Sequence, residues 1–135
     1  MVVAELMRTD VRAIGARGTL AEAVAAMLNT QVSALPVLDE EGRPVGVVTN
    51  REILAATLGN GAHDAVRSPD LIPVEEFMAP WPAVAHPQME VDDAARMMSY
   101  LDLKRLFVVD EDRLVGVISQ TDIVDAFATA RYAAL

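Results

Sequence analysis

The 135-residue sequence contains no cysteine, so neither a disulfide framework nor a thiolate metal site is open to it. It also has no long apolar run, and its start, MVVAELMRTD, contains acidic residues. We therefore predict neither a signal peptide nor a membrane span, and we expect a cytoplasmic protein.

Positive charge is scarce: 11 lysines and arginines face 20 aspartates and glutamates, for a formal net charge of −9. Because proteins usually bind nucleic-acid phosphates by neutralising them with lysine and arginine, this balance argues against nucleic-acid binding. The two histidines, His63 and His86, have no set of ligand residues near them, which argues against a metal site. Glycine-rich phosphate loops, dinucleotide fingerprints and a convincing serine–histidine–aspartate set are missing as well.

Apolar residues, by contrast, make up 53% of the chain, enough for a real core, and the chain repeats itself. Met7 matches Met78 at a shift of 71 positions, whereas Gly46 matches Gly116 at a shift of 70. The lost residue lies in a turn, DEEGRPV in one copy and DEDRLV in the other, where such a change is tolerated. We predict repeats at residues 1–60 and 73–135, joined by a linker at 61–72.

Each repeat predicts the order strand, helix, strand, strand, helix. The stretches VRAI and PAVA are extended, and TLAE begins a helix with Thr19 as cap and Glu22 reaching back. Hairpin strands then lead into a last helix. One such unit buries its apolar face poorly, so we predict an α+β fold of two fused βαββα repeats, packed with pseudo-two-fold symmetry. The helix faces expected to be buried are Leu20, Ala23, Val24, Met27 and Leu28; Ile53, Leu54 and Leu58; Val91, Ala94, Ala95 and Met98; and Ile123, Val124 and Phe127.

The two copies share a junction, VGVVTNREIL at 45–54 and VGVISQTDIV at 115–124. Each ends a strand and begins a helix, where unpaired N–H groups and the helix dipole attract phosphate. Thr49 or Ser119 adds a hydroxyl, and Glu52 or Asp122, three residues on, supplies a carboxylate that can accept hydrogen bonds from a ribose. The same spacing is a capping box, so it also fits a purely structural role.

These motifs resemble a tandem pair of CBS domains (the cystathionine-β-synthase type), a stand-alone Bateman module, over nearly the whole chain. FMAPWPAVAHPQMEVDDAARMM carries the Met-x-x-x-Pro pattern of the family. VSALPVLDEEGRPVGVVTNREIL and RLFVVDEDRLVGVISQTDIV carry its paired strands and its Gly-h-h-Ser/Thr-x-x-Asp end.

The resemblance implies a sensor of adenosine compounds, commonly AMP, ADP or ATP and less often S-adenosylmethionine or NAD, bound between the repeats. It implies that Asp122 binds the ribose and Ser119 a phosphate. It places Lys104 and Arg105 where the family often has phosphate-binding basic residues. The adenine would meet Asp10, Gly15, and the backbone at Val32 and Ser33, although this last pair fits the start of a buried strand equally well.

Two observations separate the repeats. LDLKRLFVV places two adjacent cations at a strand start where the first repeat, VSALPVL, has none. The alternatives for this Lys-Arg pair are a solvated strand end or an ion pair with Asp102 or Asp110. In the other junction Glu52 is one methylene longer than the expected acid, so we expect a weaker second site. Its residues would be Thr49, Arg51, Glu52, Trp81, Pro82 and His86, with Trp81 alternatively serving interface packing.

We therefore expect a regulatory adenine-nucleotide sensor without catalytic activity or a required cofactor, which alters its contacts with an unidentified effector protein. The resemblance also implies a homodimer. The alternative is a dimeric interaction or scaffold protein with vestigial nucleotide sites. A nucleotide hydrolase would need a base, a nucleophile and usually Mg²⁺ carboxylates in one cleft, and the sequence offers no convincing set.

Overall fold

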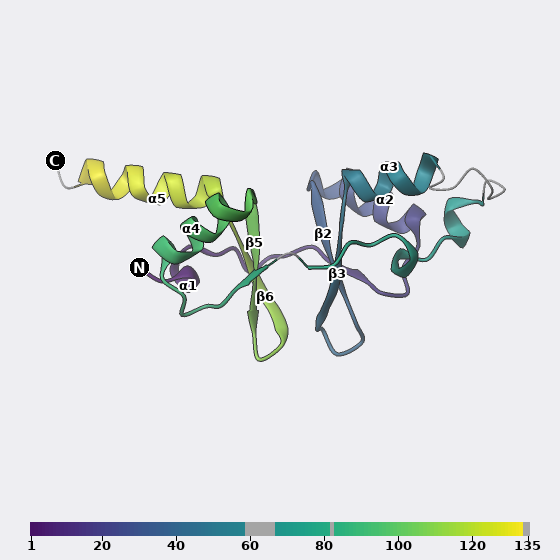
Figure 1. Cartoon of the computed structure of the whole chain (residues 1–135), viewed down its shortest axis with the longest axis horizontal. Coiled ribbons are helices and arrows are strands. Elements are labelled where there is room, and N and C mark those ends of the chain that lie inside the picture. The colour runs from purple at the N-terminus through teal and green to yellow at the C-terminus, as the bar shows by residue number, and fades with distance from the viewer. Residues whose placement is uncertain (59–66, 82, 134–135) are drawn as a thin grey trace. The chain divides into compact units, whose positions relative to one another are not determined.

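The computed structural model describes residues 1–58, 67–81 and 83–133, with side chains as far as residue 129. It divides into two compact units (Figure 1). Unit 1 combines Met1–Val11 with Ala83–Leu135, and unit 2 is Arg12–Pro82. The units therefore differ from the predicted sequence ranges 1–60 and 73–135, because each repeat gives its leading segment to the sheet of the other. Residues 61–66 of the predicted linker lie outside the described residues.

Unit 2 is built on a three-stranded sheet of order β1-β2-β3. The first pair is parallel and the second is antiparallel, as expected for a helical crossover followed by a hairpin. Its elements are β1 (Ile14–Gly15), α2 (Leu20–Thr30), β2 (Ala34–Leu38), β3 (Pro44–Thr49), α3 (Asn50–Leu58) and the 3₁₀ turns η1 (Pro69–Leu71) and η2 (Val74–Glu76).

Unit 1 repeats this plan with the sheet order β4-β5-β6. It is preceded by a short helix from the very start of the chain. Its elements are α1 (Val3–Leu6), β4 (Val84–Ala85), α4 (Val91–Leu101), β5 (Arg105–Asp110), β6 (Arg113–Ser119) and α5 (Gln120–Ala133). The predicted α+β class and the two repeats are confirmed, although the first strands are shorter than VRAI and PAVA.

The exchanged leading segments are part of the cores. Val3 is fully buried in unit 1, where its N–H donates to the carbonyl of Met89 at 2.8 Å. Its counterpart in the repeat, Val74, is fully buried in unit 2, and its N–H donates to the carbonyl of Gly18 at 2.8 Å. Burial of an apolar side chain of this size contributes roughly 1.5–3 kcal/mol to stability, so these segments hold each unit together.

The first helix of each repeat packs as its pattern predicts. In α2, the Thr19 hydroxyl accepts the N–H of Glu22 at 3.3 Å, which confirms the cap. The Glu22 carboxylate reaches back to the Thr19 hydroxyl, at 3.5 Å. The buried positions are Leu20, Ala23 and Met27 in α2 and Val91, Ala94 and Met98 in α4, with Val24 and Ala95 half-buried.

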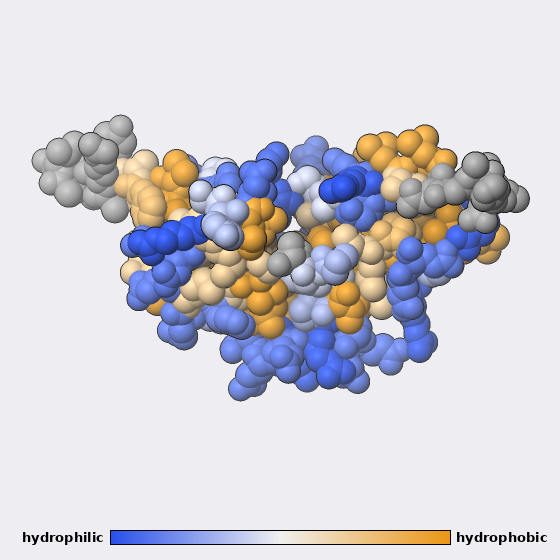
Figure 2. Space-filling view, in the orientation of Figure 1, coloured by the Kyte–Doolittle hydropathy of each residue, from blue (hydrophilic) through white to orange (hydrophobic). Residues whose placement is uncertain are grey.

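Several residues of the predicted helix faces are exposed, so that part of the prediction was wrong. Among residues 120–129 of α5 only Ile123 is buried in the core of unit 1, and in α3 Ile53 is half-buried against the core of unit 2. In its described part, each of these two helices thus places one isoleucine against a core, and the neighbouring apolar positions are exposed. The apolar surface over α3 is visible in Figure 2. The exposed residues are Leu28 (73%), Leu54 (59%), Leu58 (81%), Val124 (63%) and Phe127 (47%).

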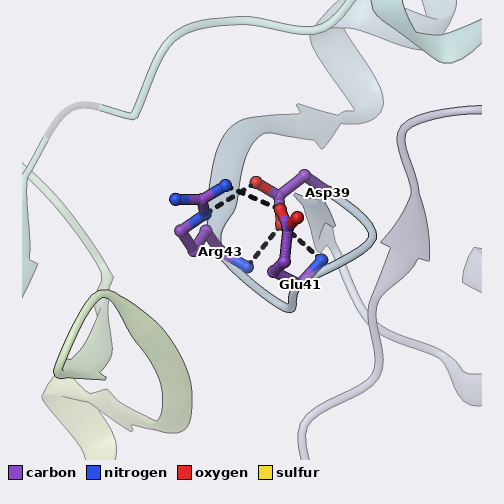
Figure 3. A network of polar contacts seen from close by, with 3 residues as sticks. All are labelled: Asp39, Glu41 and Arg43. Atoms are coloured by element: carbon purple, nitrogen blue, oxygen red, sulfur yellow. Dashed lines mark hydrogen bonds and ion pairs between the residues drawn. The ribbon is translucent and has the colours of Figure 1, made fainter.

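The two hairpins use different turns. Between β2 and β3, the Asp39 carboxylate accepts the N–H groups of Glu41 and Arg43, each at 2.9 Å, and pairs with the Arg43 guanidinium (Figure 3). The N–H of Arg43, followed by its guanidinium, lowers the pKa of Asp39. From Asp110 to Arg113 the chain is one residue shorter than between their counterparts Asp39 and Arg43, and Glu111 and Asp112 both have positive φ, at 50° and 65°. Such backbone is strained for Glu111, whereas Asp112 tolerates it better because a short polar side chain can hydrogen-bond locally.

Candidate functional site

The junction of unit 1 lies where β6 ends at Ser119 and α5 begins at Gln120. The Ser119 hydroxyl accepts the N–H of Asp122, and the Ser119 N–H donates to Oδ2 of Asp122, both at 3.1 Å. This reciprocal pair is a capping box, and it explains why the helix begins here. The structural role that the spacing allows is therefore real, and any role in ligand binding is added to it.

The structure brings the two predicted basic residues to this junction. Arg105 lies directly opposite Ser119 in the β5–β6 ladder. The carbonyl of Lys104 accepts the N–H of Gln120 at 2.9 Å, which ties the start of β5 to the first turn of α5. Lys104 is exposed and Arg105 is half-buried. Within the described residues neither forms an ion pair, so the predicted alternative of pairing with Asp102 or Asp110 is not observed there.

A third cation at the junction, Arg8, was missed by sequence reasoning. Its N–H donates to the carbonyl of Val117 at 2.8 Å and its carbonyl accepts the Val117 N–H at 2.9 Å, so it extends the edge of β6. Its guanidinium then reaches Oδ1 of Asp122, from Nη2 at 3.2 Å and from Nε at 3.4 Å. Asp122 is 13% exposed and Arg8 is 72% exposed. The only signal in the sequence was the neighbouring Met7, whose repeat counterpart is Met78.

We call Met7–Arg8 in unit 1 and Met78–Ala79 in unit 2 the edge segments. Each edge segment pairs with the last strand of its sheet, β6 or β3, and packs directly against a glycine that both repeats share. A Cβ at Gly116 would lie 2.8 Å from Sδ of Met7 and 2.9 Å from the carbonyl oxygen of Arg8. A Cβ at Gly46 would lie 2.5 Å from Sδ of Met78 and 3.0 Å from the carbonyl oxygen of Ala79. The glycine of each junction motif is therefore needed for close approach of the edge segment.

The junction of unit 2 has the same backbone and different side chains. Oε1 of Glu52 accepts both the N–H of Thr49 at 2.8 Å and its hydroxyl at 2.6 Å. The edge segment pairs with Val47 through two hydrogen bonds of 2.9 Å, but it carries Ala79 where unit 1 has Arg8. This edge segment therefore offers Glu52 no cation.

The other residues predicted for the second site belong to both units. Arg51 is exposed, with its N–H bonded to the Thr49 hydroxyl at 3.3 Å, and Trp81 is half-buried in unit 2. His86 belongs to unit 1, where its Nδ1 lies 2.9 Å from the carbonyl oxygen of Val109. Pro82 lies outside the described residues.

The residues predicted for adenine do not all gather at one place. In unit 2, Gly15 pairs with Leu38, the last residue of β2, whereas Val32 and Ser33 precede its first residue. At about 3.3 Å per residue, Gly15 lies roughly 16 Å from Ser33 along the strand. No site confined to unit 2 can therefore use both. Asp10 belongs to unit 1 and is exposed.

Among residues 1–58, 67–81 and 83–133, no group of three or more histidine, cysteine or acidic side chains is placed to hold a metal ion. Across the same ranges, none of the helices has the length and apolar character needed to cross a bilayer.

A sequence model of the CBS domain matches the chain twice, over residues 3–59 and 74–129. The chain therefore belongs to the CBS domain family, which confirms the predicted resemblance.

Individual relatives agree with this assignment. CBS domain-containing protein YhcV of Bacillus subtilis (strain 168) is 31% identical over 121 residues, which cover 90% of this chain and 81% of YhcV. The crystal structure of CBSX2 in complex with AMP has a TM-score of 0.82 at 24% identity, covering 96% of this chain and 98% of that one. The CBS domain pair of protein MJ0100, in complex with 5′-methylthioadenosine and S-adenosyl-L-methionine, has a TM-score of 0.78 at 25% identity, with the same coverage.

Proposed function

We propose that this protein is a regulatory module that binds an adenine nucleotide at the unit 1 junction and catalyses no reaction. The observation that carries the proposal is the gathering of a hydroxyl, a carboxylate and three cations at the end of β6, in a chain with a net charge of −9. Two of its structural relatives were crystallised with adenosine compounds. Those ligands set the class of compound that we expect here.

The chemistry of the junction suits a sugar phosphate. The Asp122 carboxylate can accept hydrogen bonds from vicinal ribose hydroxyls. The Ser119 hydroxyl and the basic pair Lys104–Arg105 suit a phosphate, because charge-assisted hydrogen bonds are roughly twice as strong as neutral ones. The adenine contacts implied by the family resemblance, at Asp10, Val32 and Ser33, stay predictions.

As a sensor, the module must link binding to a change in another interaction. A ligand shifts a conformational equilibrium only if it binds the two states with different affinities. We propose that the output is altered contact with an effector protein in the cytoplasm. We also propose a homodimer, supported by the exposed apolar residues of α3 and α5, which a second copy would cover.

The second candidate function is a dimeric scaffold with vestigial nucleotide sites. The junction of unit 2 favours it, because the Thr49 hydroxyl already donates to Glu52 at 2.6 Å and the edge segment there carries Ala79. A scaffold would keep a stable dimer whose melting temperature does not respond to nucleotides, whereas a binding protein is stabilised by its ligand through mass action.

Calorimetric titration with AMP, ATP and S-adenosylmethionine tests the proposal. We expect binding of at least one of them, lost on Asp122→Ala and largely kept in the matched variant Glu52→Ala. Absence of heat with every ligand, or equal affinity in Asp122→Ala, would contradict nucleotide binding at this junction. Native mass spectrometry of the same samples reports the dimer and any co-purified nucleotide. A nucleotide hydrolase would instead release ADP or AMP from ATP, at a rate abolished by Asp122→Ala.

A further inference from the structure

An ion pair occupies the carboxylate that would receive the ribose. Oδ1 of Asp122 takes two hydrogen bonds from Arg8, and Oδ2 takes one from the N–H of Ser119. An ionised carboxylate has about four acceptor sites, so these three contacts leave about one open. A ribose diol that donates two hydrogen bonds to Asp122 must therefore displace Arg8 at least in part.

The displaced guanidinium would stay at the junction. Its backbone is held to β6 by the two hydrogen bonds with Val117, while its side chain is 72% exposed and has room to turn. Once Asp122 is engaged by neutral hydroxyls, the cations Arg8, Lys104 and Arg105 stand beside the sugar with no described carboxylate paired to them. An anionic group on the ligand is what this arrangement would attract, and a phosphate matches the donor fork of a guanidinium.

We propose that Arg8 is a specificity-determining residue, which exchanges Asp122 for the phosphate of the ligand as the ribose binds. The site then selects phosphorylated adenosine compounds such as AMP over unphosphorylated or cationic ones such as adenosine or S-adenosylmethionine. Only a phosphate replaces the ion pair that ribose binding breaks. This inference rests on the proposed function of the Asp122 junction and adds the basis of its selectivity.

The junction of unit 2 serves as an internal comparison. There the acid accepts two hydrogen bonds from Thr49, and the edge segment carries no guanidinium to exchange. Capping therefore needs the acid in both junctions, but it does not need Arg8. Arg8 is present only in the junction of unit 1. Its removal should therefore change the selectivity for phosphorylated ligands and leave the capping of the helix intact.

The test is calorimetric titration of the full chain with AMP and with adenosine, which differ only by the phosphate. We expect wild type to bind AMP at least about tenfold more tightly than adenosine. A ratio of this size is what one hydrogen bond to a charged group contributes to affinity. Arg8→Ala should reduce this ratio about tenfold, by weakening AMP while adenosine binds equally or more tightly. Arg8→Lys, which keeps the charge without the fork, should fall between the two.

The matched control is Arg96→Ala, which removes another exposed arginine of unit 1 and its 3.0 Å ion pair with Asp93 on α4. It should leave the ratio unchanged, and thermal unfolding of each variant confirms that it is folded. If Arg8→Ala weakens both ligands equally or leaves the ratio unchanged, the role of Arg8 is overturned. Equal binding of adenosine and AMP by wild type would overturn it too, while nucleotide binding stands. Binding of neither ligand by wild type would remove the proposed function and this inference together.

Discussion

The two junctions share a backbone and differ in what their side chains leave for a ligand. Both have a glycine crossed by an edge segment and an acid that caps the following helix. In unit 1 the acid is Asp122 and the edge segment supplies Arg8. In unit 2 the acid is Glu52 and the edge segment supplies Ala79. In both copies the acid accepts the N–H of the hydroxyl residue three positions earlier, which gives it a structural role, so the acid alone does not mark a binding site. The cations around it separate the two.

Gly116→Ala and Gly46→Ala test the part that the junctions share, and we expect the largest effects on stability here. The new methyl group meets a backbone carbonyl as well as a methionine side chain at each position. Overpacking of this kind costs roughly 1–3 kcal/mol, so both variants should unfold at lower urea concentration. Gly116→Ala should also weaken AMP binding by displacing Arg8, whereas Gly46→Ala should not. If both variants are as stable as wild type, the edge segments can move away from the new methyl group at little cost in free energy, which would contradict this prediction.

The hairpin turns also differ between the two units, in the residues that have positive φ. Replacing Glu111 by Asn and Asp112 by Gly supplies residues that accept positive φ in a two-residue hairpin turn. We expect a gain of about 1 kcal/mol in the free energy of unfolding. In unit 2, Gly42→Ala should lose about as much, because Gly42 has a φ of 82°. Urea unfolding measures both, and a destabilised Asn–Gly variant would contradict the strain assigned to this turn.

Grafting tests whether two side chains make the difference. The double variant Ala79→Arg with Glu52→Asp gives unit 2 the residues of unit 1. An ion pair at such an exposed place contributes only about 0–1 kcal/mol, so stability should change little. AMP binding at the second junction should be strengthened, seen as a higher stoichiometry in calorimetry. Unchanged binding would show that Lys104 and Arg105, which the graft does not copy, are needed as well.

The smallest effect concerns the Asp39 turn of unit 2. The folded pKa of Asp39 lies below its ordinary value of 3.8, chiefly because its carboxylate accepts the N–H of Arg43. The ionised carboxylate therefore contributes to stability above pH 3.8, and this contribution is lost as the pH falls through the folded pKa. Asp39→Asn should be slightly less stable than wild type at pH 7, with the difference shrinking in acid. Thermal unfolding at pH 7 and pH 3 checks this, and a difference independent of pH would contradict it.

The features that could be predicted from the sequence are those that depend on nearby residues or on the internal repeat. The capping boxes depend on residues three apart, and the meeting of Arg105 with Ser119 follows from a hairpin. The Arg8–Asp122 pair could not be reached in this way, because it joins residues 114 positions apart. Nothing in a periodic pattern says which of two similar sheets a leading segment will join.

The remaining misses have other causes. Helical spacing places Leu54 and Val124 on an apolar face, but it does not say whether a core lies opposite, and both are exposed. Gly15 was assigned to the adenine by family resemblance. The parallel register of β1 puts it at the far end of β2 from Ser33.

The exchange of leading segments has a consequence for how the chain folds during synthesis. Unit 2 is continuous, from Arg12 to Pro82, so it can form as soon as that stretch has left the ribosome. Unit 1 forms later, because Val3 packs with Met89 and with core residues as far along the sequence as Ile123, all of which are synthesised after unit 2. Closing so long a loop is slow and leaves the first residues unprotected meanwhile. Deleting Met1–Val11 should therefore damage unit 1, which includes those residues, while unit 2, which begins at Arg12, keeps its core.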